Sequence, residues 1–347
     1  MLQRREVLAL AAVAATALPA AHAQAPQQPL RRIGFASCIH QAGPQGLVDF
    51  LARQPFDLFL FGGDNVYAPR PYARDKLRAA YALAASHPGY TRLRGLAHMA
   101  VWDDNDYDSA DGGANFAFRQ EARDEFLAFW QVPPGDARRA RDGLYHAQTF
   151  GPPGQRVQAI LLDTRSFRSP IRRELVRLPG NGGYVPDADP GLDMLGAAQW
   201  QWLQEQLQAP ADVRLIVSSI QVLAEGHRWE RWGNLPAERD RLLRLLASTR
   251  AQGVVLLSGD RHFGAFYRQE AGGAYPLTEL TSSGVTHSWE SPTDAQGNRS
   301  GPAYTGLNFA SIDIDWAARS LRLAVRDAQG AERLGRTIAF NELKARP

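Results

Sequence analysis

Four apolar runs, each ending in residues of the kinds that bind metal ions, place the strongest constraint on the fold of this chain. They cover residues 33–38, 57–61, 96–102 and 253–258. At or just after their ends stand Cys38, Gly63-Asp64-Asn65-Val66-Tyr67, Trp102-Asp103-Asp104-Asn105-Asp106 and Gly259-Asp260-Arg261-His262. In α/β proteins, side chains at the carboxyl ends of strands converge on a ligand. A thiolate, carboxylates, a phenol and an imidazole at these ends predict a di-metal hydrolytic centre with a hard cation such as ferric iron.

The remaining sequence predicts a layered α/β structure. Further strands are expected at 156–164 and 213–222, and helices at 46–53, 72–86, 115–130, 196–207 and 238–250. Residues 277–281, 309–315 and 320–327 are expected to form antiparallel strands at the end of the chain. Because strands and helices alternate without a break, we expect one domain. The segments 178–193 and 288–306 have no periodicity and are predicted to be functional rims or flaps.

Composition excludes some classes of protein. With 347 residues, 44% of them hydrophobic and 22% charged, the chain can bury a large core. The formal net charge of +3 is too small to predict a nucleic-acid partner. A single cysteine rules out a framework of disulfides within the chain. No nucleic-acid partner is therefore expected, and the chain is expected to be a monomer.

Residues 1–23 are predicted to be an export signal. A charged start, an apolar run to Ala20 and the small-x-small site Ala21-His22-Ala23 fit a cleaved signal better than a membrane span. Arg4-Arg5 resembles a twin-arginine signal, which exports folded proteins; an ordinary secretory signal is the alternative. The predicted partner is therefore the twin-arginine machinery, and the location is periplasmic or secreted. Residues 24–30 would be a linker, and residues 31–347 the catalytic domain.

The turn at residues 63–67 offers a bridging ligand. Asp64 can bind two cations through its two oxygens, and Tyr67, three residues on, can place a phenolate on the same metal. Capping of a following helix is the alternative role for an isolated aspartate. In residues 102–106, three acids lie close together, which is repulsive unless cations neutralise them or the turn is solvated. Asp260 and His262 alternate, so both can reach a metal from one loop; a structural histidine is the alternative.

Five ordered motifs resemble the PhoD-like alkaline phosphatase family of the metallophosphoesterase superfamily. They are Ser37-Cys38, residues 63–67, residues 102–106, Leu162-Asp163-Thr164-Arg165-Ser166-Phe167-Arg168 and residues 258–262. The resemblance implies a sandwich of two mixed β-sheets flanked by helices. It also implies a ferric ion, a second divalent ion that is calcium or else zinc or manganese, and hydrolysis of phosphate esters, including diesters and phospholipids in some members.

Carried over to this chain, the resemblance assigns metal ligands and substrate contacts. Iron would be bound by Cys38, Asp64, Tyr67 and His262, and the second cation by Asp64, Asp104, Asp260 and, least securely, Gln221. Arg165 would direct its guanidinium at phosphate oxygens, with an ion pair to Asp163 as the alternative. His287 would reach the substrate or be structural.

Asn105 departs from the family pattern. The family has a histidine here, which can protonate a leaving alkoxide, whereas an amide cannot transfer a proton at neutral pH. Either the leaving group needs little protonation, or His287 or metal-bound water supplies the proton, or activity is low.

The sequence thus predicts an exported, metal-dependent hydrolase in which a metal-bound hydroxide attacks phosphorus in a small phosphate ester. A phosphodiesterase or phospholipase D-like enzyme is the first alternative, and an open cleft rimmed by Trp229, Trp232 and Trp289 would favour it. A phosphate-binding protein without turnover is the second.

Overall fold

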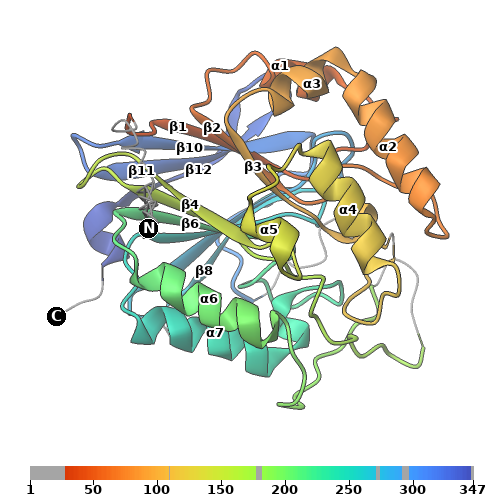
Figure 1. Ribbon diagram of the computed structural model, residues 1–347. Coiled ribbons are helices and arrows are strands. Elements are labelled where there is room, and N and C mark those ends of the chain that lie inside the picture. Colours follow the sequence, from red (N-terminus) through yellow and green to blue (C-terminus); the bar gives the residue numbers. More distant parts are fainter. Residues whose placement is uncertain (1–27, 109, 177–181, 271–273, 291–296, 345–347) are drawn as a thin grey trace, which may run out of the picture.

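The apolar runs form two β-sheets that pack face to face in the computed structural model (Figure 1). The structure describes residues 28–108, 110–176, 182–270, 274–290 and 297–344. Within these ranges each sheet has six strands. The predicted sandwich of two mixed sheets flanked by helices is therefore confirmed.

The first sheet has the strand order β12-β11-β10-β1-β2-β3. Its parallel part consists of β1 (Arg32–Ala36), β2 (Leu58–Gly62) and β3 (His98–Val101). Its antiparallel part consists of β10 (Asn308–Asp315), β11 (Ser320–Asp327) and β12 (Glu332–Ala339). The three parallel strands end at one edge, because β1, β2 and β3 run in the same direction.

The second sheet has the order β4-β5-β6-β7-β9-β8. Its parallel strands are β5 (Val157–Leu161), β6 (Val213–Ser218), β7 (Val254–Ser258) and β9 (Leu277–Ser282). The edge strands β4 (His146–Phe150) and β8 (Gly264–Gln269) are antiparallel to their neighbours. Every residue of the four parallel strands is buried, as expected for strands covered on both faces, and the buried set includes polar residues such as Arg214 in β6 and Glu279 in β9.

Helices cover the outer faces of the sandwich (Figure 1). The helices α1 (Gly46–Leu51), α2 (Arg74–Ser86), α3 (Pro88–Arg94) and α4 (Arg119–Phe129) lie on the side of the first sheet. The helices α6 (Gly196–Gln208) and α7 (Pro236–Ser248) lie side by side under the second, and α5 (Ala137–Ala140) is a single turn. Three 3₁₀ turns are described: η1 (Asp104–Asp106), η2 (Trp232–Asn234) and η3 (Phe340–Leu343).

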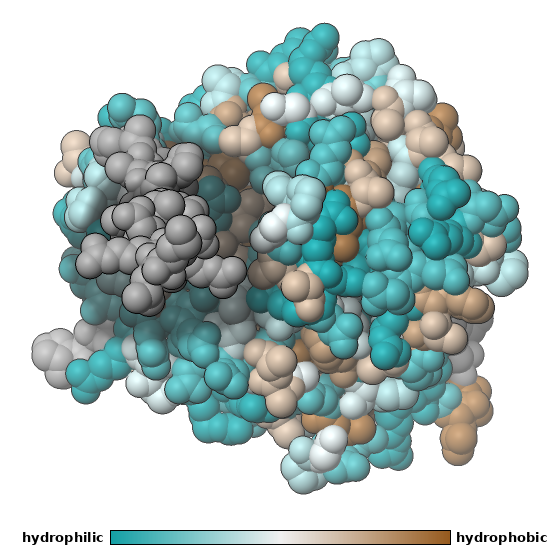
Figure 2. Space-filling view, viewed as in Figure 1, coloured by the Kyte–Doolittle hydropathy of each residue, from teal (hydrophilic) through white to brown (hydrophobic). Residues whose placement is uncertain are grey.

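Apolar residues are scattered among hydrophilic ones on the face shown in Figure 2. Among the described residues, no helix combines the length and apolar character needed to cross a bilayer.

Two expectations about secondary structure need correction. Residues 277–281 were expected among the antiparallel strands at the end of the chain, but β9 belongs to the second sheet and pairs in parallel with β7; only its pairing with β8 is antiparallel. The strands β4, β8 and β12 and the helix α3 were not predicted. α3 begins at Pro88, a residue that ends one helix and is well suited to the first turn of the next. The predicted export signal and residues 24–27 of the linker lie outside the described residues.

Candidate metal centre

The carboxyl ends of both parallel sets of strands meet at one place. Cys38 follows β1, Asp64 follows β2 and Asp104 follows β3; from the second sheet, His262 follows β7 and His287 follows β9. Contacts join the two sets, because the Tyr67 hydroxyl lies 3.3 Å from Nε2 of both His262 and His287. Both sheets therefore supply polar side chains to a single site.

Left-handed backbone is concentrated at this site. Cys38, Asp64, Asp260 and His262 have φ angles of 63°, 52°, 65° and 57°, and they make up four of the eight non-glycine residues with positive φ in the described part of the chain. This conformation is costly for residues with a Cβ atom, and it persists only where the surrounding structure enforces it. The backbone at the strand ends thus places these four residues in a left-handed conformation that most non-glycine residues avoid.

The first group of potential ligands is the thiol cluster, which consists of Cys38, Asp64 and His262. One ligand atom of each lies within 4.8 Å of the others. The Tyr67 hydroxyl donates to Asp64 Oδ2 at 3.0 Å, so this phenol adjoins the same cluster. Sulfur, imidazole, carboxylate and phenol are thus gathered as the sequence predicts.

The second group is the carboxylate cluster, which consists of Asp64, Asp103 and Asp104, again with ligand oxygens within 4.8 Å of one another. Asp64 belongs to both clusters, which is the arrangement a carboxylate needs in order to bridge two cations. Asp103 was not among the predicted ligands, although it lies in the same acidic run as Asp104.

The residues fit cations on three observations. Among the described residues, buried His262 Nδ1 and Asp103 Oδ2 have no hydrogen-bond partner, and each belongs to one of the clusters. Burial, together with neighbouring carboxylates, raises the pKa of Asp64, and burial with Asp64 raises that of Cys38. Nearby positive charge would offset these costs. The mixed sulfur and nitrogen donors suit a transition metal, whereas the all-oxygen cluster suits a hard divalent ion.

Asn105 contacts the bridging aspartate. Its backbone N–H donates to Asp64 Oδ1 at 3.1 Å, and its side-chain amide donates to Asp64 Oδ2 at 3.0 Å and to Asp104 Oδ1 at 3.1 Å. Asp106, the third acid of the run, instead accepts from the backbone of Asp103 and of Asn65. In residues 102–106, Asp103 and Asp104 therefore belong to the carboxylate cluster, whereas Asp106 stabilises the backbone of the turn.

Several neighbours were not identified from the sequence. Ser283 Oγ lies 3.1 Å from Cys38 Sγ and accepts from the backbone of His262 at 2.7 Å. The His40 ring stacks on Tyr67 at 4.9 Å between centroids. The sequence gives little indication of either residue. A serine directly after a strand and a histidine two residues after Cys38 form no pattern that marks a functional site.

The prediction that Arg165 binds phosphate is not supported by its position. Its side chain is 0% exposed. Nε donates to Asp103 at 2.6 Å, and the two terminal nitrogens donate to Glu230 at 2.9 and 2.5 Å. The alternative ion pair with Asp163 is not among the ion pairs of the described residues: the guanidinium pairs with Asp103 and Glu230, and Asp163 accepts the backbone N–H of Arg165. Arg165 instead links a member of the carboxylate cluster to a buried glutamate.

Gln221 and Asp260, both predicted as ligands of the second cation, lie outside the two clusters. Both ends of the Gln221 amide have protein partners: the nitrogen donates to Thr281 Oγ1 at 3.0 Å, and the oxygen lies 3.0 Å from His227 Nε2. Asp260 belongs to neither cluster of the described chain, and burial raises its pKa to about 7. Asp103, rather than Asp260, completes the carboxylate cluster.

The expected tryptophan rim is only partly formed. Trp232 is buried, and its indole N–H donates to Ser218. Trp229 and Trp289 do pack together, with centroids 4.6 Å apart, and the Trp289 ring meets the edge of His262 at 5.1 Å.

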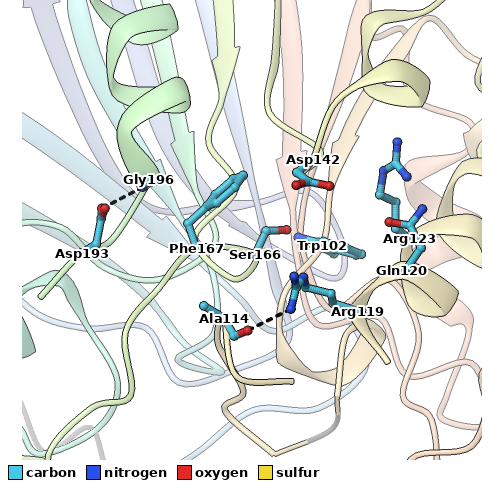
Figure 3. A pocket seen from close by; sticks show the side chains of 11 residues that line it. Trp102, Ala114, Arg119, Gln120, Arg123, Asp142, Ser166, Phe167, Asp193 and Gly196 are labelled. Carbon is cyan, nitrogen blue, oxygen red and sulfur yellow. Dashed lines mark hydrogen bonds between the residues drawn. The ribbon is translucent and has the colours of Figure 1, made fainter. Parts of the chain in front are cut away.

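A cavity of about 280 Å³ near Trp102 does not contain the clusters (Figure 3). Arg119 on its wall donates to the carbonyl of Ala114, and Asp193 accepts from the backbone of Gly196. These two charged side chains are thus already bonded within the protein.

The sandwich with a polar centre at its strand ends defines a metallophosphoesterase-type fold, and solved structures share it. A structure of PhoD has a TM-score of 0.69 and 18% identity, covering 91% of this chain and 70% of its own. A purple acid phosphatase from seeds of yellow lupin (Lupinus luteus) has a TM-score of 0.63 and 11% identity, covering 91% of this chain and 55% of its own.

Sequence comparison identifies the family. The pattern of the PhoD-like phosphatases matches residues 33–312, and the chain belongs to this family. Alkaline phosphatase D of Bacillus subtilis (strain 168) is 24% identical over 289 residues, which are 71% of this chain. The match spans about half of that relative, 47% of its length.

Proposed function

We propose that this protein hydrolyses phosphate esters at a two-cation centre formed by the thiol and carboxylate clusters. The observation that carries the proposal is that Asp64 belongs to both clusters. Family membership supports it, because the family is named for phosphatases. Ferric iron at the thiol cluster and calcium at the carboxylate cluster are the proposed metals.

Bound cations would supply Lewis acidity toward phosphate oxygens and a water of lowered pKa. The protein's own part begins with Asn105, whose amide hydrogen bonds hold Asp64 and Asp104 in fixed orientations. That amide is therefore a positioning group.

His287 is the proposed proton donor to the leaving oxygen. Its ring is half-buried at the site, with Nε2 3.3 Å from the Tyr67 hydroxyl and 3.1 Å from His262 Nε2. Thr286 lies 3.1 Å from its other nitrogen and steadies the ring. An imidazole can exchange a proton near neutral pH, which the Asn105 amide cannot do.

Export is part of the proposal. The charged and apolar pattern of residues 1–23, including Arg4-Arg5, supports transport through the twin-arginine machinery, followed by the linker 24–30 and the catalytic domain 31–347. Fractionation of cells that express the chain tests this: the wild-type chain should appear in the periplasm or medium, and Arg4→Lys with Arg5→Lys should retain it inside.

The decisive experiment assays the purified protein on mono- and diesters, with metal analysis before and after treatment with a chelator. We expect turnover that chelation abolishes and metal addition restores. Turnover unaffected by complete metal removal would contradict the two-cation proposal. Binding of inorganic phosphate without turnover of any ester would instead favour a phosphate-binding protein.

A further inference from the structure

A groove lined by aromatic rings adjoins the carboxylate cluster. Its volume is about 500 Å³, within the range usual for small-molecule sites. The rings that line it are Tyr72, Phe116, Phe118 and Tyr184. Phe118 is 50% exposed, which is unusual for a phenylalanine, and it stacks on Tyr72 with centroids 5.5 Å apart and 18° between planes.

Other ring contacts keep the groove rigid. The ring of Phe116 packs edge-on against Tyr72, with centroids 4.9 Å apart. Tyr72, which stacks on Phe118, is therefore itself held by a second ring. On the opposite chain segment, the guanidinium of Arg173 lies 4.5 Å from the centre of the Tyr184 ring. The Tyr184 hydroxyl donates to Asp111 at 2.6 Å. The groove thus combines fixed flat faces with a polar rim.

Two contacts connect this groove to the metal centre. Asp111, which lines the groove, donates its backbone N–H to Asp104 Oδ2 at 3.4 Å. Arg70 precedes the groove residue Pro71, and its exposed guanidinium is 4.0 Å from the same Asp104 oxygen. A phosphate held at the carboxylate cluster would therefore have a cation, Arg70, at Asp104 and the groove next to it through Asp111.

We propose that this groove binds a planar aromatic substituent of the phosphate ester. The inference rests on the proposed function, because it names the kind of ester that the same site prefers. An exposed ring, preorganised by stacking, gains contact with a flat ligand at little entropic cost. The exposed cations Arg70 and Arg173 add attraction for the phosphate and for an electron-rich ring.

The test compares phenylphosphonate with methylphosphonate, which share an anionic head that cannot be hydrolysed and differ only in the ring. Calorimetry should show that the purified, metal-containing protein binds phenylphosphonate about 3- to 10-fold more tightly, the range expected for one aromatic contact. Phe118→Ala should bring the ratio of the two dissociation constants close to one, whereas Phe118→Trp should retain it.

Leu83→Ala is the matched control, because Leu83 is 42% exposed on α2 and does not line the groove. The ratio of the two dissociation constants should be the same for Leu83→Ala as for the wild type. Thermal unfolding should show that all variants fold. A wild-type ratio near one, or a ratio that Phe118→Ala leaves unchanged, would overturn the inference. Since calorimetry requires no turnover, a preference for the ring in a protein that hydrolyses nothing would refute the proposed function and keep the groove.

Discussion

Replacing Arg165 by methionine distinguishes a structural role from substrate binding. The guanidinium is buried between Asp103 and Glu230, which are 1% and 2% exposed, and it donates to both. Arg168 also lies 2.8 Å from Glu230 and would remain as its partner. The variant would therefore leave Asp103 in a buried site with its nearest positive charge removed.

The magnitude follows from the loss of one partner in a buried ion network. Removing one member of a buried pair costs about 3–5 kcal/mol, because the remaining charge is left uncompensated. With an unfolding entropy of about 2 cal/mol/K per residue, a chain of this size should unfold roughly 4–7 °C lower. Adding Asp103→Asn should recover part of this loss, since the uncompensated carboxylate is then replaced by a neutral amide.

Thermal unfolding and ester hydrolysis should be measured on the same preparations, with Arg244→Met, on α7, as the control for loss of an exposed arginine. We expect the Arg165 variant to lose stability and to bind metal more weakly at the carboxylate cluster, because Asp103 Oδ1 keeps only the Ser219 hydroxyl of its side-chain donors. An unfolding temperature within 1 °C of the wild type, together with a raised KM for phosphate esters, would refute this reasoning and restore the phosphate-binding role.

Three further predictions test the centre and the fold. If Tyr67 binds ferric iron as a phenolate, the protein should be coloured, and Tyr67→Phe should remove the colour. Cys38→Ser should lose iron but remain folded by circular dichroism. An active, colourless preparation without iron would contradict both expectations. Because His287 is the proposed proton donor, His287→Gln should lower kcat/KM for alkyl esters relative to nitrophenyl esters, on the scale of about 10²–10⁴-fold for general acid catalysis; an unchanged ratio would show that another group supplies the proton. Burial and Arg138 lower the pKa of His146 to about 3. Below pH 6.5 the unfolded chain therefore binds a proton at this histidine and the folded chain does not. The free energy of unfolding consequently falls as the pH drops below 6.5. Between pH 7 and pH 5, the free energy of unfolding of His146→Gln, measured in urea, should therefore fall by about 2 kcal/mol less than that of the wild type. An equal fall in both proteins would contradict this.

The strands that carry the centre could be predicted because each is an apolar run followed at once by polar residues. This pattern located Cys38, Asp64 and His262 correctly as neighbours. The strands β4 and β12 could not be predicted in the same way, because their side chains are largely exposed or half-buried and lack a continuous apolar run. Local sequence thus indicated strands with continuous apolar runs, including the edge strand β3, and missed the other three edge strands of the described sheets, β4, β8 and β12.

The environment of Arg165 could not be predicted either. Its partner Glu230 lies in a loop between β6 and α7, and nothing in the local sequence shows that this loop returns to the end of β3. The groove beside the metal centre was missed for the same reason. Its rings come from segments before α2, before α4 and around residue 184, which only the tertiary structure brings together.

The thiol cluster joins residue 38 to residue 262, so it is among the longest-range contacts of the chain. Synthesis proceeds from the amino terminus, and Cys38 and Asp64 emerge from the ribosome long before β7 and His262 follow. A cation bound by the complete cluster therefore cannot be acquired before β7 and His262 have been synthesised. Closing so distant a contact is also slow compared with local pairing. Metal uptake should consequently be a late step of folding, and a metal-loaded molecule reports that the carboxyl ends of β1, β2 and β7 have come together.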